Sequence, residues 1–457
     1  MNTLKIFNTL NNKKEVFIPI SKNHIKIYAC GPTVYNFAHI GNARMAVVFD
    51  TFVRTLRVIY PKVTYVSNIT DIDDKIIEAA KEQNTEISKI TQKFTQIYNE
   101  DMSMLNVLQP DIQPKATEYI PEMIELIKDL INKQFAYEKN GHVLFHVPTY
   151  SMYGKLSNRN REEQIAGSRV EIAPFKKDPS DFVLWKPSDD TQPGWDSPWG
   201  LGRPGWHTEC SAMSEKTLGL PFDIHGGGRD LIFPHHENEI AQSCCSTANI
   251  DEPDSYAKYW MHNGFVTIDG EKMSKSLGNI ILVRDLIQDH HGEVIRLALL
   301  SSHYRQGLDW NEKIIHQAKK LLNKMYAILD DLKSINITKS DSSNNEDISI
   351  LLDDLNTPGL IAELNKIAKD YNSDASDKES VKSKLLLIGS VLGIFQDKSF
   401  NQVSEELRQK IEVLIAKRNN AKKDKNFDMA DQIRNELNEL GIEIKDTSEG
   451  TSWNIKS

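Results

Sequence analysis

Two histidines and two carboxylates stand close together in the stretch FPHHENE, residues 233–239. Proline suits the first position of a helix, so a helix is predicted to begin at Pro234. His235 and Glu239 then lie one turn apart on the same helix face. Such a pair can chelate a divalent metal, although the same spacing is also found in solvated surface pairs.

Two cysteines could complete a metal site with this pair. Cys30 ends a predicted strand, where α/β sheets place their active sites, and Cys210 lies in GWHTECSAMS. Cysteine, histidine and glutamate are all zinc ligands. The sequence has no CxxC spacing, so a site assembled from distant segments is favoured over a structural zinc ribbon. The other two cysteines, Cys244 and Cys245, are predicted to pack in the core.

Two further segments could bind a nucleotide. In AHIGNAR a histidine and a glycine precede a predicted helix, whose N-terminus attracts phosphate through its free N–H groups and its dipole. His39 could add a donor, and Gly41 would permit close approach of the backbone. In DGEKMSKSLGN, Lys272 and Lys275 could offset the charge of a leaving pyrophosphate. Taken singly, each segment also fits an ordinary helix start or an exposed basic turn.

These residues fall where predicted strands end and predicted helices begin. Residues 24–30 and 63–70 have the apolar pattern of strands, and residues 40–58 and 71–83 have apolar side chains at helical spacing. This alternation predicts an α/β fold with a parallel sheet.

The rest of the chain does not continue this alternation of predicted strands and helices. From about residue 114 to 205, a helical stretch, a strand-like GHVLFHV and a segment dense in Trp, Pro and Gly predict an insertion, after which FDIHGGG resumes the sheet pattern. Beyond Asp309 the chain is predicted to be helical, with a polar linker over 336–347 and a polar tail ending GTSWNIKS.

The bulk composition is that of a globular protein. The 457 residues exceed one ordinary domain, and a net charge of -9 means that nucleic-acid binding would need a local basic surface. Four cysteines are too few for a disulfide scaffold at this length. Neither a signal peptide nor an apolar stretch long enough to span a bilayer is found. A reduced, soluble, cytoplasmic protein without membrane contact is expected.

Taken together, these segments resemble the class I aminoacyl-tRNA synthetases. AHIGN and KMSKS are similar to the two signature sequences of that class, and the pair is far more specific than either member. The segments CGPTVYNFAHIGNAR, NITDIDDK, GRPGWHTECSAMS, DIHGGGRDLIFPHHENEIAQS and EKMSKSLGN resemble the cysteine-specific members of bacterial type. The resemblance runs from LKIFNT to GTSW and covers nearly the whole chain.

The resemblance implies a Rossmann-type parallel-sheet catalytic domain with an insertion, followed by an α-helical tRNA-binding domain and a small C-terminal anticodon-recognition module. A monomer is expected. The implied boundaries are 1–113 and 206–310 for the two halves of the catalytic domain, 114–205 for the insertion, 311–403 for the helical domain and 404–457 for the C-terminal module.

The resemblance also implies an activity and a set of functional residues. ATP, with Mg²⁺, would activate L-cysteine to cysteinyl-adenylate, and the cysteinyl group would pass to the 3′-terminal adenosine of tRNA(Cys). One Zn²⁺ per chain is implied. The implied residues are Cys30, Cys210, His235 and Glu239 for zinc; His39, Gly41, Asn42, Asp230 and Lys275 for ATP; His39, Asn42, Lys272 and Lys275 for catalysis; and Thr70, Trp206 and His225 for the cysteine pocket.

The C-terminal segment KRNNAKKDK carries five basic side chains around one aspartate. On charge alone this pattern indicates a solvated helix face, but the resemblance favours contact with tRNA. Unstacked anticodon bases are read on aromatic or guanidinium planes, so Arg418, Arg434 and Trp453 are the candidates.

One position departs from the first signature, which usually ends in histidine. Asn42 occupies that place here. An amide can still donate a hydrogen bond to a phosphate or ribose oxygen, but it carries no positive charge. Activity is expected to survive this change.

The implied substrate explains why a metal would be needed. Cysteine and serine differ by one atom, and an apolar pocket separates such near-isosteres by only about 10- to 200-fold. Zinc binds a thiol as a soft thiolate, whereas a hydroxyl is a weaker acid and a poorer ligand. The metal is therefore expected to hold the substrate side chain, and no editing domain is expected.

Two other functions stay open on the sequence alone. A cysteine ligase of mycothiol biosynthesis has a similar core but needs no anticodon module, and the stretch 404–457 argues against it. A catalytically silent paralogue that binds tRNA or senses a metal is the second alternative. The intact KMSKS and the four ligand candidates argue against that reading.

Overall fold

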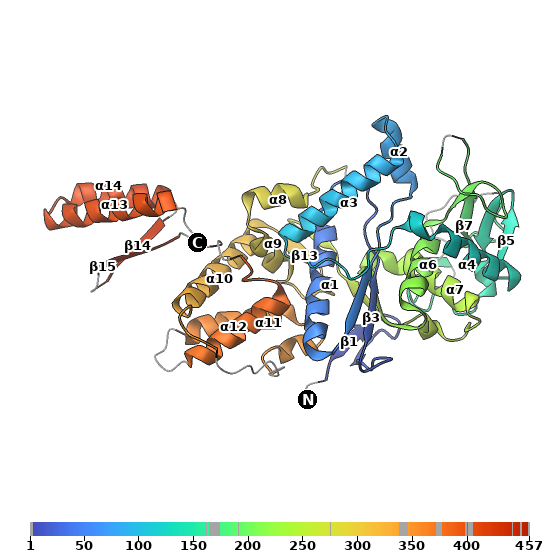
Figure 1. Cartoon of the computed structure of the whole chain (residues 1–457), viewed down its shortest axis with the longest axis horizontal. Coiled ribbons are helices and arrows are strands. Elements are labelled where there is room, and N and C mark those ends of the chain that lie inside the picture. Colours follow the sequence, from blue (N-terminus) through green and yellow to red (C-terminus); the bar gives the residue numbers. More distant parts are fainter. Residues whose placement is uncertain are drawn as a thin grey trace.

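At the centre of the computed structural model is a sheet of four parallel strands in the order β10-β9-β3-β4 (Figure 1). The strands are β3 (Ile25–Ala29), β4 (Val63–Ser67), β9 (Phe222–Gly228) and β10 (Ala257–Asn263). The structure describes residues 3–160, 162–163, 174–190, 192–274, 276–337, 346–371, 377–397, 400, 405–440, 442–447 and 450–455.

The order of the strands reverses between β3 and β9. From β3 the chain runs through α1 to β4 on one side, and from β9 it runs through α7 to β10 on the other. The crevice at the carboxyl ends of β3 and β9 is the position where open α/β sheets bind ligands. The predicted parallel α/β fold is confirmed. The helices nearest this sheet are α1 (Ile40–Ile59), α6 (Trp206–Leu218) and α7 (Glu237–Ser246).

Side chains along β3 point alternately to the two faces of the sheet, and this alternation determines the face on which Cys30 lies. Ile25, Ile27 and Ala29 belong to the apolar cluster that includes the buried face of α1. Tyr28 and Cys30 belong to the cluster on the other face, which includes residues of α6 and α7. Because successive strand residues point to opposite faces, the pattern of β3 directs Cys30 toward the two helices that carry the other candidate ligands.

The glycine run of β9 permits α1 to pack closely on the sheet. A Cβ atom at Gly226 would lie 2.1 Å from the ring of Phe49, which is fully buried on α1. No side chain could occupy that position without displacing the helix.

The region between β4 and β9 holds a second sheet, antiparallel, in the order β5-β6-β7-β8. Figure 1 shows it at the right of the molecule, beside α4 and α6. Asp74, at the start of α2, pairs with Lys186 at 2.7 Å and Arg203 at 3.2 Å, and so ties this sheet to the helices after β4. The elements are α2 (Asp74–Glu82), α4 (Ile120–Asn132), β5 (Ala136–Lys139), β6 (His142–Phe145), β7 (Phe182–Pro187) and β8 (Gly202–Pro204).

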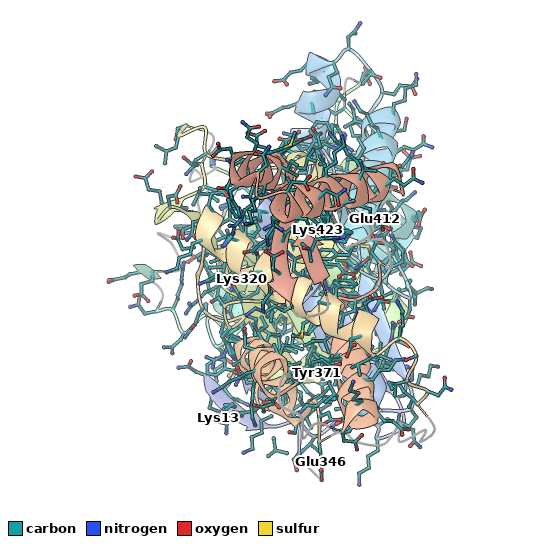
Figure 2. All side chains as sticks on the ribbon, turned by 90° about the vertical axis from the view of Figure 1, so that its left-hand side faces the viewer. Lys13, Lys320, Glu346, Tyr371, Glu412 and Lys423 are labelled. Atoms are coloured by element: carbon teal, nitrogen blue, oxygen red, sulfur yellow. The ribbon has the colours of Figure 1, made fainter. Side chains whose placement is uncertain are left out.

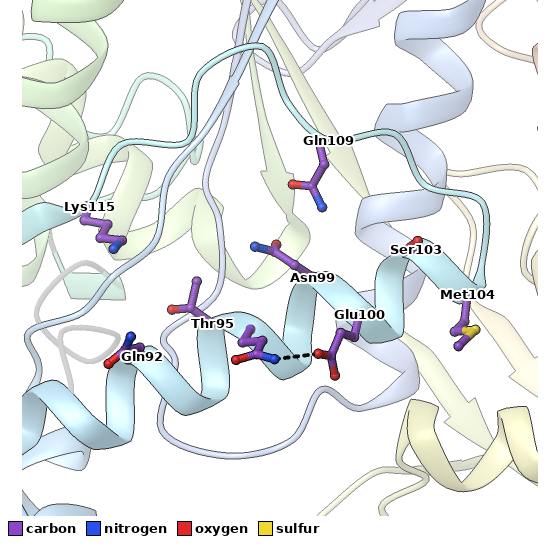
Figure 3. Close-up of a pocket in the computed structure, with 9 residues that line it drawn as sticks. Gln92, Thr95, Asn99, Glu100, Ser103, Met104, Gln109 and Lys115 are labelled. Carbon is purple, nitrogen blue, oxygen red and sulfur yellow. Dashed lines mark hydrogen bonds between the residues drawn. The ribbon is translucent and has the colours of Figure 1, made fainter.

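Helix α3 (Ile87–Met104) runs from the projecting end of α2 back toward the sheet, and the sequence patterns did not predict it. Between α3 and the segment that follows it lies a polar cavity of about 610 Å³ (Figure 3). Gln96 donates a hydrogen bond of 2.8 Å to Glu100 along its floor. Its lining is mainly amide and hydroxyl side chains, and it contains none of the candidate site residues.

Helices follow the sheet, as predicted. The strands of a small three-stranded sheet, in the order β12-β11-β13, alternate with them in the chain, because two of the helices lie between β12 and β13. The cluster of buried residues around α1 continues into these helices, so the two regions share a core. The elements are β11 (Val266–Ile268), β12 (Glu271–Lys272), α8 (Val283–Asp289), α9 (Gly292–Leu299), β13 (Leu308–Trp310), α10 (Glu312–Asp331), α11 (Thr357–Asp370) and α12 (Lys378–Leu392).

Buried charged side chains fasten the helical region to α1. Arg296 of α9 pairs with Asp50 of α1 and donates to backbone carbonyls of Leu105 and Leu392. Glu293, one turn earlier, accepts the hydroxyl of Tyr326 on α10 at 2.8 Å. Since a buried charge is costly unless paired, these contacts fix the helices in one orientation.

The C-terminal part consists of α13 (Glu405–Lys423), α14 (Phe427–Glu439) and a hairpin of β14 (Ile442–Thr447) and β15 (Gly450–Ile455). Figure 1 shows it set apart at the left, and Figure 2 turns that side toward the viewer, with Lys423 and Glu412 of α13 labelled. The prediction of a polar tail is wrong, because the part of it that the structure describes, residues 442–447 and 450–455, forms the hairpin. The predicted linker over 336–347 lies largely outside the described residues. Among the described residues, no helix is both long enough and apolar enough to cross a membrane.

Candidate active site

The structure brings together the four side chains that the sequence proposes as metal ligands. Cys30 directly follows β3, Cys210 lies in the second turn of α6, and Glu239 lies in the first turn of α7. His235 lies in the turn just before α7. All four are buried, with at most 3% of their surface exposed.

The helix after β9 starts later than predicted. The predicted start at Pro234 is wrong, because the α-helix begins at Glu237. Residues 232–236 form a separate wide turn in which Phe233 is extended, with φ -139° and ψ 130°. His235 nevertheless remains within reach of Glu239, and its Nε2 lies 3.0 Å from Glu239 Oε1.

The distances from Cys30 Sγ to the other three donor atoms fit a tetrahedral metal. Cys30 Sγ lies 3.6 Å from each of Cys210 Sγ, His235 Nε2 and Glu239 Oε1. Zinc bonds of about 2.3 Å to sulfur and about 2.0–2.2 Å to nitrogen or oxygen place tetrahedral ligand atoms about 3.3–3.8 Å apart. The two cysteines are free thiols. The group can therefore hold a metal ion.

The four side chains of the group differ in protonation when no metal is bound. Burial opposes charge on Glu239 and His235, but attraction between Glu239 and its two histidine neighbours prevails. It holds the pKa of Glu239 well below its usual range and raises the pKa of His235 to about 10. A hydrogen bond from Cys30 lowers the pKa of the Cys210 thiol to about 6. Glu239 and Cys210 are thus anionic at neutral pH, the form that binds metals. Without a metal, His235 is protonated and Cys30, whose pKa burial raises, is a neutral thiol, so metal binding must release both of these protons.

Further partners hold Glu239 by its second oxygen. His225 Nε2 lies 2.7 Å from Glu239 Oε2, and the Tyr256 hydroxyl donates to the same atom at 2.8 Å. This leaves Oε1 directed at Cys30 and His235. Such outer contacts orient metal ligands. The sequence patterns did not single out Tyr256, and no local spacing marks it.

A second group overlaps the first. Cys30, His225, His236 and Glu239 also bring one donor atom each within 4.8 Å of one another. His236 Nε2 lies 4.0 Å from Glu239 Oε1, however, whereas His235 Nε2 lies 3.0 Å away. His235 is therefore the nearer of the two histidines to Glu239, whereas His236 is the nearer to Cys30 Sγ, at 3.4 Å against 3.6 Å. The doublet HH in FPHHENE is the signal that could have drawn attention to His236.

The first signature forms the N-terminus of α1. His39 is the N-cap, and its Nδ1 accepts hydrogen bonds from the N–H groups of Gly41 at 3.1 Å and Asn42 at 3.3 Å. Asn42 Oδ1 in turn accepts from the N–H of His39 at 3.1 Å. This reciprocal pair is a capping box, with Asn42 in the place usually held by Glu or Gln.

The second signature lies next to the first. Residues 38–40 pair with residues 281–283 through a bridge between His39 and Leu282 and two backbone hydrogen bonds. A Cβ atom at Gly41 would lie 3.3 Å from Met273 Cε. Segments some 230 residues apart thus meet at one helix N-terminus.

The loop of the second signature is fastened at its base. Asn279 Oδ1 accepts the N–H of Ser274 at 2.9 Å, and Asn279 Nδ2 donates to the carbonyl of Lys272 at 3.3 Å. The ammonium of Lys272 lies 5.7 Å from the ring centre of Phe265. Lys275 lies outside the described residues, so its predicted place at ATP remains a prediction.

Comparison with known proteins identifies the family. Residues 16–320 match the family described as "tRNA synthetases class I (C) catalytic domain", and residues 404–453 match "Cysteinyl-tRNA ligase anticodon binding domain". Proteins named Cysteine--tRNA ligase from Saccharophagus degradans and Parvibaculum lavamentivorans are each 51% identical to this chain. The alignments cover 99% of this chain and 99% and 98% of those proteins. The chain belongs to the cysteine–tRNA ligase family.

Solved structures of other synthetases share the fold. Mycobacterium tuberculosis methionyl-tRNA synthetase in complex with methionyl-adenylate has a TM-score of 0.57 at 13% identity, covering 81% of this chain and 89% of that one. The LeuRS–tRNA–LeuAMS complex of Agrobacterium radiobacter K84 has a TM-score of 0.59 at 12% identity, covering 82% and 84%. At these identities the likeness shows the class I fold alone.

Two of the three residues predicted for the cysteine pocket of this cysteine–tRNA ligase family member contact the candidate metal ligands. Trp206 stacks on the His235 ring, with ring centres 4.2 Å apart, and is 38% exposed. His225 is fully buried behind Glu239. Thr70 is buried near β4 and accepts a hydrogen bond of 3.3 Å from Asn68 Nδ2. Trp206 is thus the most accessible of the three predicted residues.

Asp230 lies in the short turn 229–231 after β9 and is exposed. Its carboxylate acts electrostatically on His39: burial lowers the pKa of that imidazole, and Asp230 partly offsets the shift. The two residues are therefore near neighbours at the carboxyl end of the sheet, where a nucleotide is expected.

The three candidates for tRNA contact are placed differently from one another. Arg418 is 7% exposed, and its guanidinium binds both carboxylate oxygens of Asp446 at 2.9 and 3.0 Å. Arg434 is exposed on α14, and Trp453 is half-buried on β15. Arg418 thus supports the hairpin, and contact of any of the three with tRNA remains a prediction.

Proposed function

We propose that this chain activates L-cysteine with ATP to cysteinyl-adenylate and transfers the cysteinyl group to the 3′-terminal adenosine of tRNA(Cys). The observation that carries the proposal is the buried group of Cys30, Cys210, His235 and Glu239, whose donor atoms all lie within 4.8 Å of one another, beside the two signature segments. The family and the matched anticodon binding domain support the same activity.

The metal of this group is proposed to be one zinc ion. Two sulfurs, an imidazole and a carboxylate are a zinc donor set, and the spacing fits zinc. Bound zinc would supply a soft Lewis acid that favours a thiolate over a hydroxyl ligand. Discrimination of about 10⁴–10⁵ between cysteine and serine corresponds to roughly 5.5–7 kcal/mol, which an apolar pocket does not reach.

The chain's own residues position and neutralise the nucleotide. The N-terminus of α1 offers N–H groups and its dipole to phosphate. Because His39 Nδ1 accepts two backbone hydrogen bonds, the neutral ring carries its proton on Nε2, which is left to donate. Lys272 and Lys275 supply positive charge for the leaving pyrophosphate, and Mg²⁺ accompanies ATP. The cysteine carboxylate is the nucleophile, and no covalent enzyme intermediate is needed.

The remaining assignments are proposed on the same basis. Residues 114–205 are an insertion in the catalytic domain, 311–403 a tRNA-binding domain and 404–457 an anticodon-recognition module. The exposed Arg434 and the half-buried Trp453 are the stronger candidates for anticodon bases. The protein is proposed to act as a cytoplasmic monomer.

The test is transfer of labelled cysteine to purified tRNA, with ATP, Mg²⁺ and zinc-loaded protein, beside a serine control. Cysteine-specific charging is expected. Adenylate formation without charging would favour an amino-sugar ligase of the mycothiol type. Failure of both reactions would favour a catalytically silent paralogue.

A further inference from the structure

A series of hydrogen-bonded side chains connects the N-terminal segment to the sulfur of Cys30. Thr9 follows strand β1 (Lys5–Asn8), and its Oγ1 lies 2.8 Å from His262 Nδ1. His262 Nε2 lies 2.8 Å from His236 Nδ1. His236 Nε2 lies 3.4 Å from Cys30 Sγ. The four residues come from four separate parts of the fold: the turn after β1, strand β10, the turn before α7 and the end of β3.

The two imidazole rings of this series, His236 and His262, are held firmly. His236 is fully buried and His262 is 6% exposed. The Trp260 ring lies almost parallel to that of His262, with 9° between the planes, and its centre is 5.2 Å from that of His236. A Cβ atom at Gly227 would lie 2.9 Å from His236 Cε1, so the glycine leaves the space that this ring fills.

The order of the contacts determines which atoms donate. A neutral imidazole has one N–H group and one lone pair, and the bond made by one nitrogen fixes the role of the other. When the Thr9 hydroxyl donates to Nδ1 of His262, that ring donates from Nε2 to His236 Nδ1. His236 then donates from Nε2 to the sulfur. A metal-bound thiolate is an acceptor and so selects this direction.

We propose that His236, oriented by His262 and Thr9, is a positioning residue that donates an N–H···S hydrogen bond to the metal-bound thiolate of Cys30. The inference rests on the metal site of the proposed function. Outer partners of this kind fix ligand orientation, and their loss typically costs about 10- to 100-fold in metal affinity. A hydrogen bond also draws electron density from the sulfur, which leaves the metal a stronger acceptor for a further thiolate.

The experiment compares Thr9→Val with Thr9→Ser in the full-length protein. Thr9→Val keeps the shape but removes the hydroxyl, and Thr9→Ser restores it. The matched control is Thr64→Val, because Thr64 Oγ1 makes a similar contact of 2.8 Å with His24 Nε2 at the amino-terminal end of β3, whereas Cys30 follows the carboxyl end of that strand. His262→Phe is the stronger variant, because it removes the middle member of the hydrogen-bonded series.

Two readouts are used, neither of which requires catalysis. The first is the apparent zinc affinity in competition with a chelator, and the second is the sulfur-to-metal charge-transfer band of the cobalt(II)-substituted protein. Thr9→Val and His262→Phe are expected to weaken zinc binding, by about 10-fold or more for His262→Phe. Both should move the charge-transfer band to lower energy, because the sulfur becomes richer in electrons. Thr9→Ser and Thr64→Val should match the wild type.

The proposal is overturned if Thr9→Val leaves both readouts at wild-type values. It is also overturned if thermal stability falls but the band does not move, because a purely structural role has that result. A change in the ligand-field bands of Thr9→Val, indicating a new coordination number, would instead make His236 a ligand. Failure of the wild-type protein to bind zinc would count against the proposed function itself and is seen before any variant is made.

Discussion

At the scale of single residues, the metal group depends on the donor chemistry of each side chain, and Cys210 occurs in only one of the two overlapping sets of candidate ligands. Replacing Cys210 by Ser exchanges a soft thiolate for a hydroxyl, which is a poor zinc ligand. We expect Cys210→Ser to lose most of its zinc, and with it the preference for cysteine over serine. Zinc content by atomic absorption and adenylate formation with both amino acids measure the two effects. Cys244→Ser is the matched control, since Cys244 is buried beside carbonyl oxygens that accept a hydroxyl. Full zinc content in Cys210→Ser would contradict the ligand set.

Two substitutions at Asn42 separate its role in capping helix α1 from a role in nucleotide binding. Asn42→Ala removes the acceptor for the His39 N–H and should cost about 0.3–1.5 kcal/mol of stability. Asn42→Asp keeps the acceptor and favours the helix dipole, so stability should be retained, but the added negative charge should raise the KM for ATP. Thermal unfolding and ATP–pyrophosphate exchange check these results. An unchanged KM in Asn42→Asp would remove Asn42 from the nucleotide site.

The local sequence was enough to predict the four ligand candidates, but it did not predict the residues that orient them. Cysteine, histidine and glutamate are recognisable donors, and the i,i+4 pair lies within one segment. Tyr256 and His262, by contrast, reach the group only through the register of β10 against β9. Nothing in the local pattern of either residue encodes that register.

At the scale of elements, the hairpin of the C-terminal part depends on one carboxylate. The guanidinium of Arg418, with help from Lys422 and Thr451, holds the pKa of Asp446 below its usual range. A depressed folded-state pKa gives stability that is present above the unfolded value of about 3.9 and is lost as the pH falls below it. We expect protection of the β14 and β15 amides, corrected for intrinsic exchange, to fall in acid. Asp446→Asn should reduce that protection at neutral pH, and Glu443→Gln, on the same strand, should not.

The elements that were predicted correctly have a strong local pattern. Strands β3 and β4 and helix α1 have uninterrupted apolar spacing. The start of α7 was misplaced because proline at a helix start is a general preference, whereas here the chain first makes an extended turn at Phe233. The hairpin of β14 and β15 was missed because its strands are rich in polar residues. Its apolar side chains gain burial only against α13 and α14.

At the scale of the whole molecule, Glu293 connects the sheet domain to the helices that follow it. Its two oxygens accept the Tyr326 hydroxyl and the N–H groups of residues 395–397. Glu293→Gln replaces one acceptor by a donor and should cost about 1–3 kcal/mol, because buried donors lose their partner. We expect tRNA charging to fall more than ATP–pyrophosphate exchange, since the helices, and not the sheet, lose their anchor. Glu363→Gln removes a half-exposed pair with Lys384 and is the control. Equal losses of tRNA charging and of ATP–pyrophosphate exchange would contradict the view that Glu293 anchors the helices and not the sheet.

The distance along the chain between the metal ligands has a consequence for the order of events during synthesis. Cys30 and Glu239 are 209 residues apart. At translation rates of about 5–20 residues per second, Cys30 leaves the ribosome about 10–40 s before Glu239 does. During that interval the first thiol has no partners from α6 or α7 and is open to oxidants and to other metals. The four-ligand site cannot form until Glu239 has been made, which is just past the midpoint of the 457-residue chain, so complete metal loading cannot begin in the first half of synthesis.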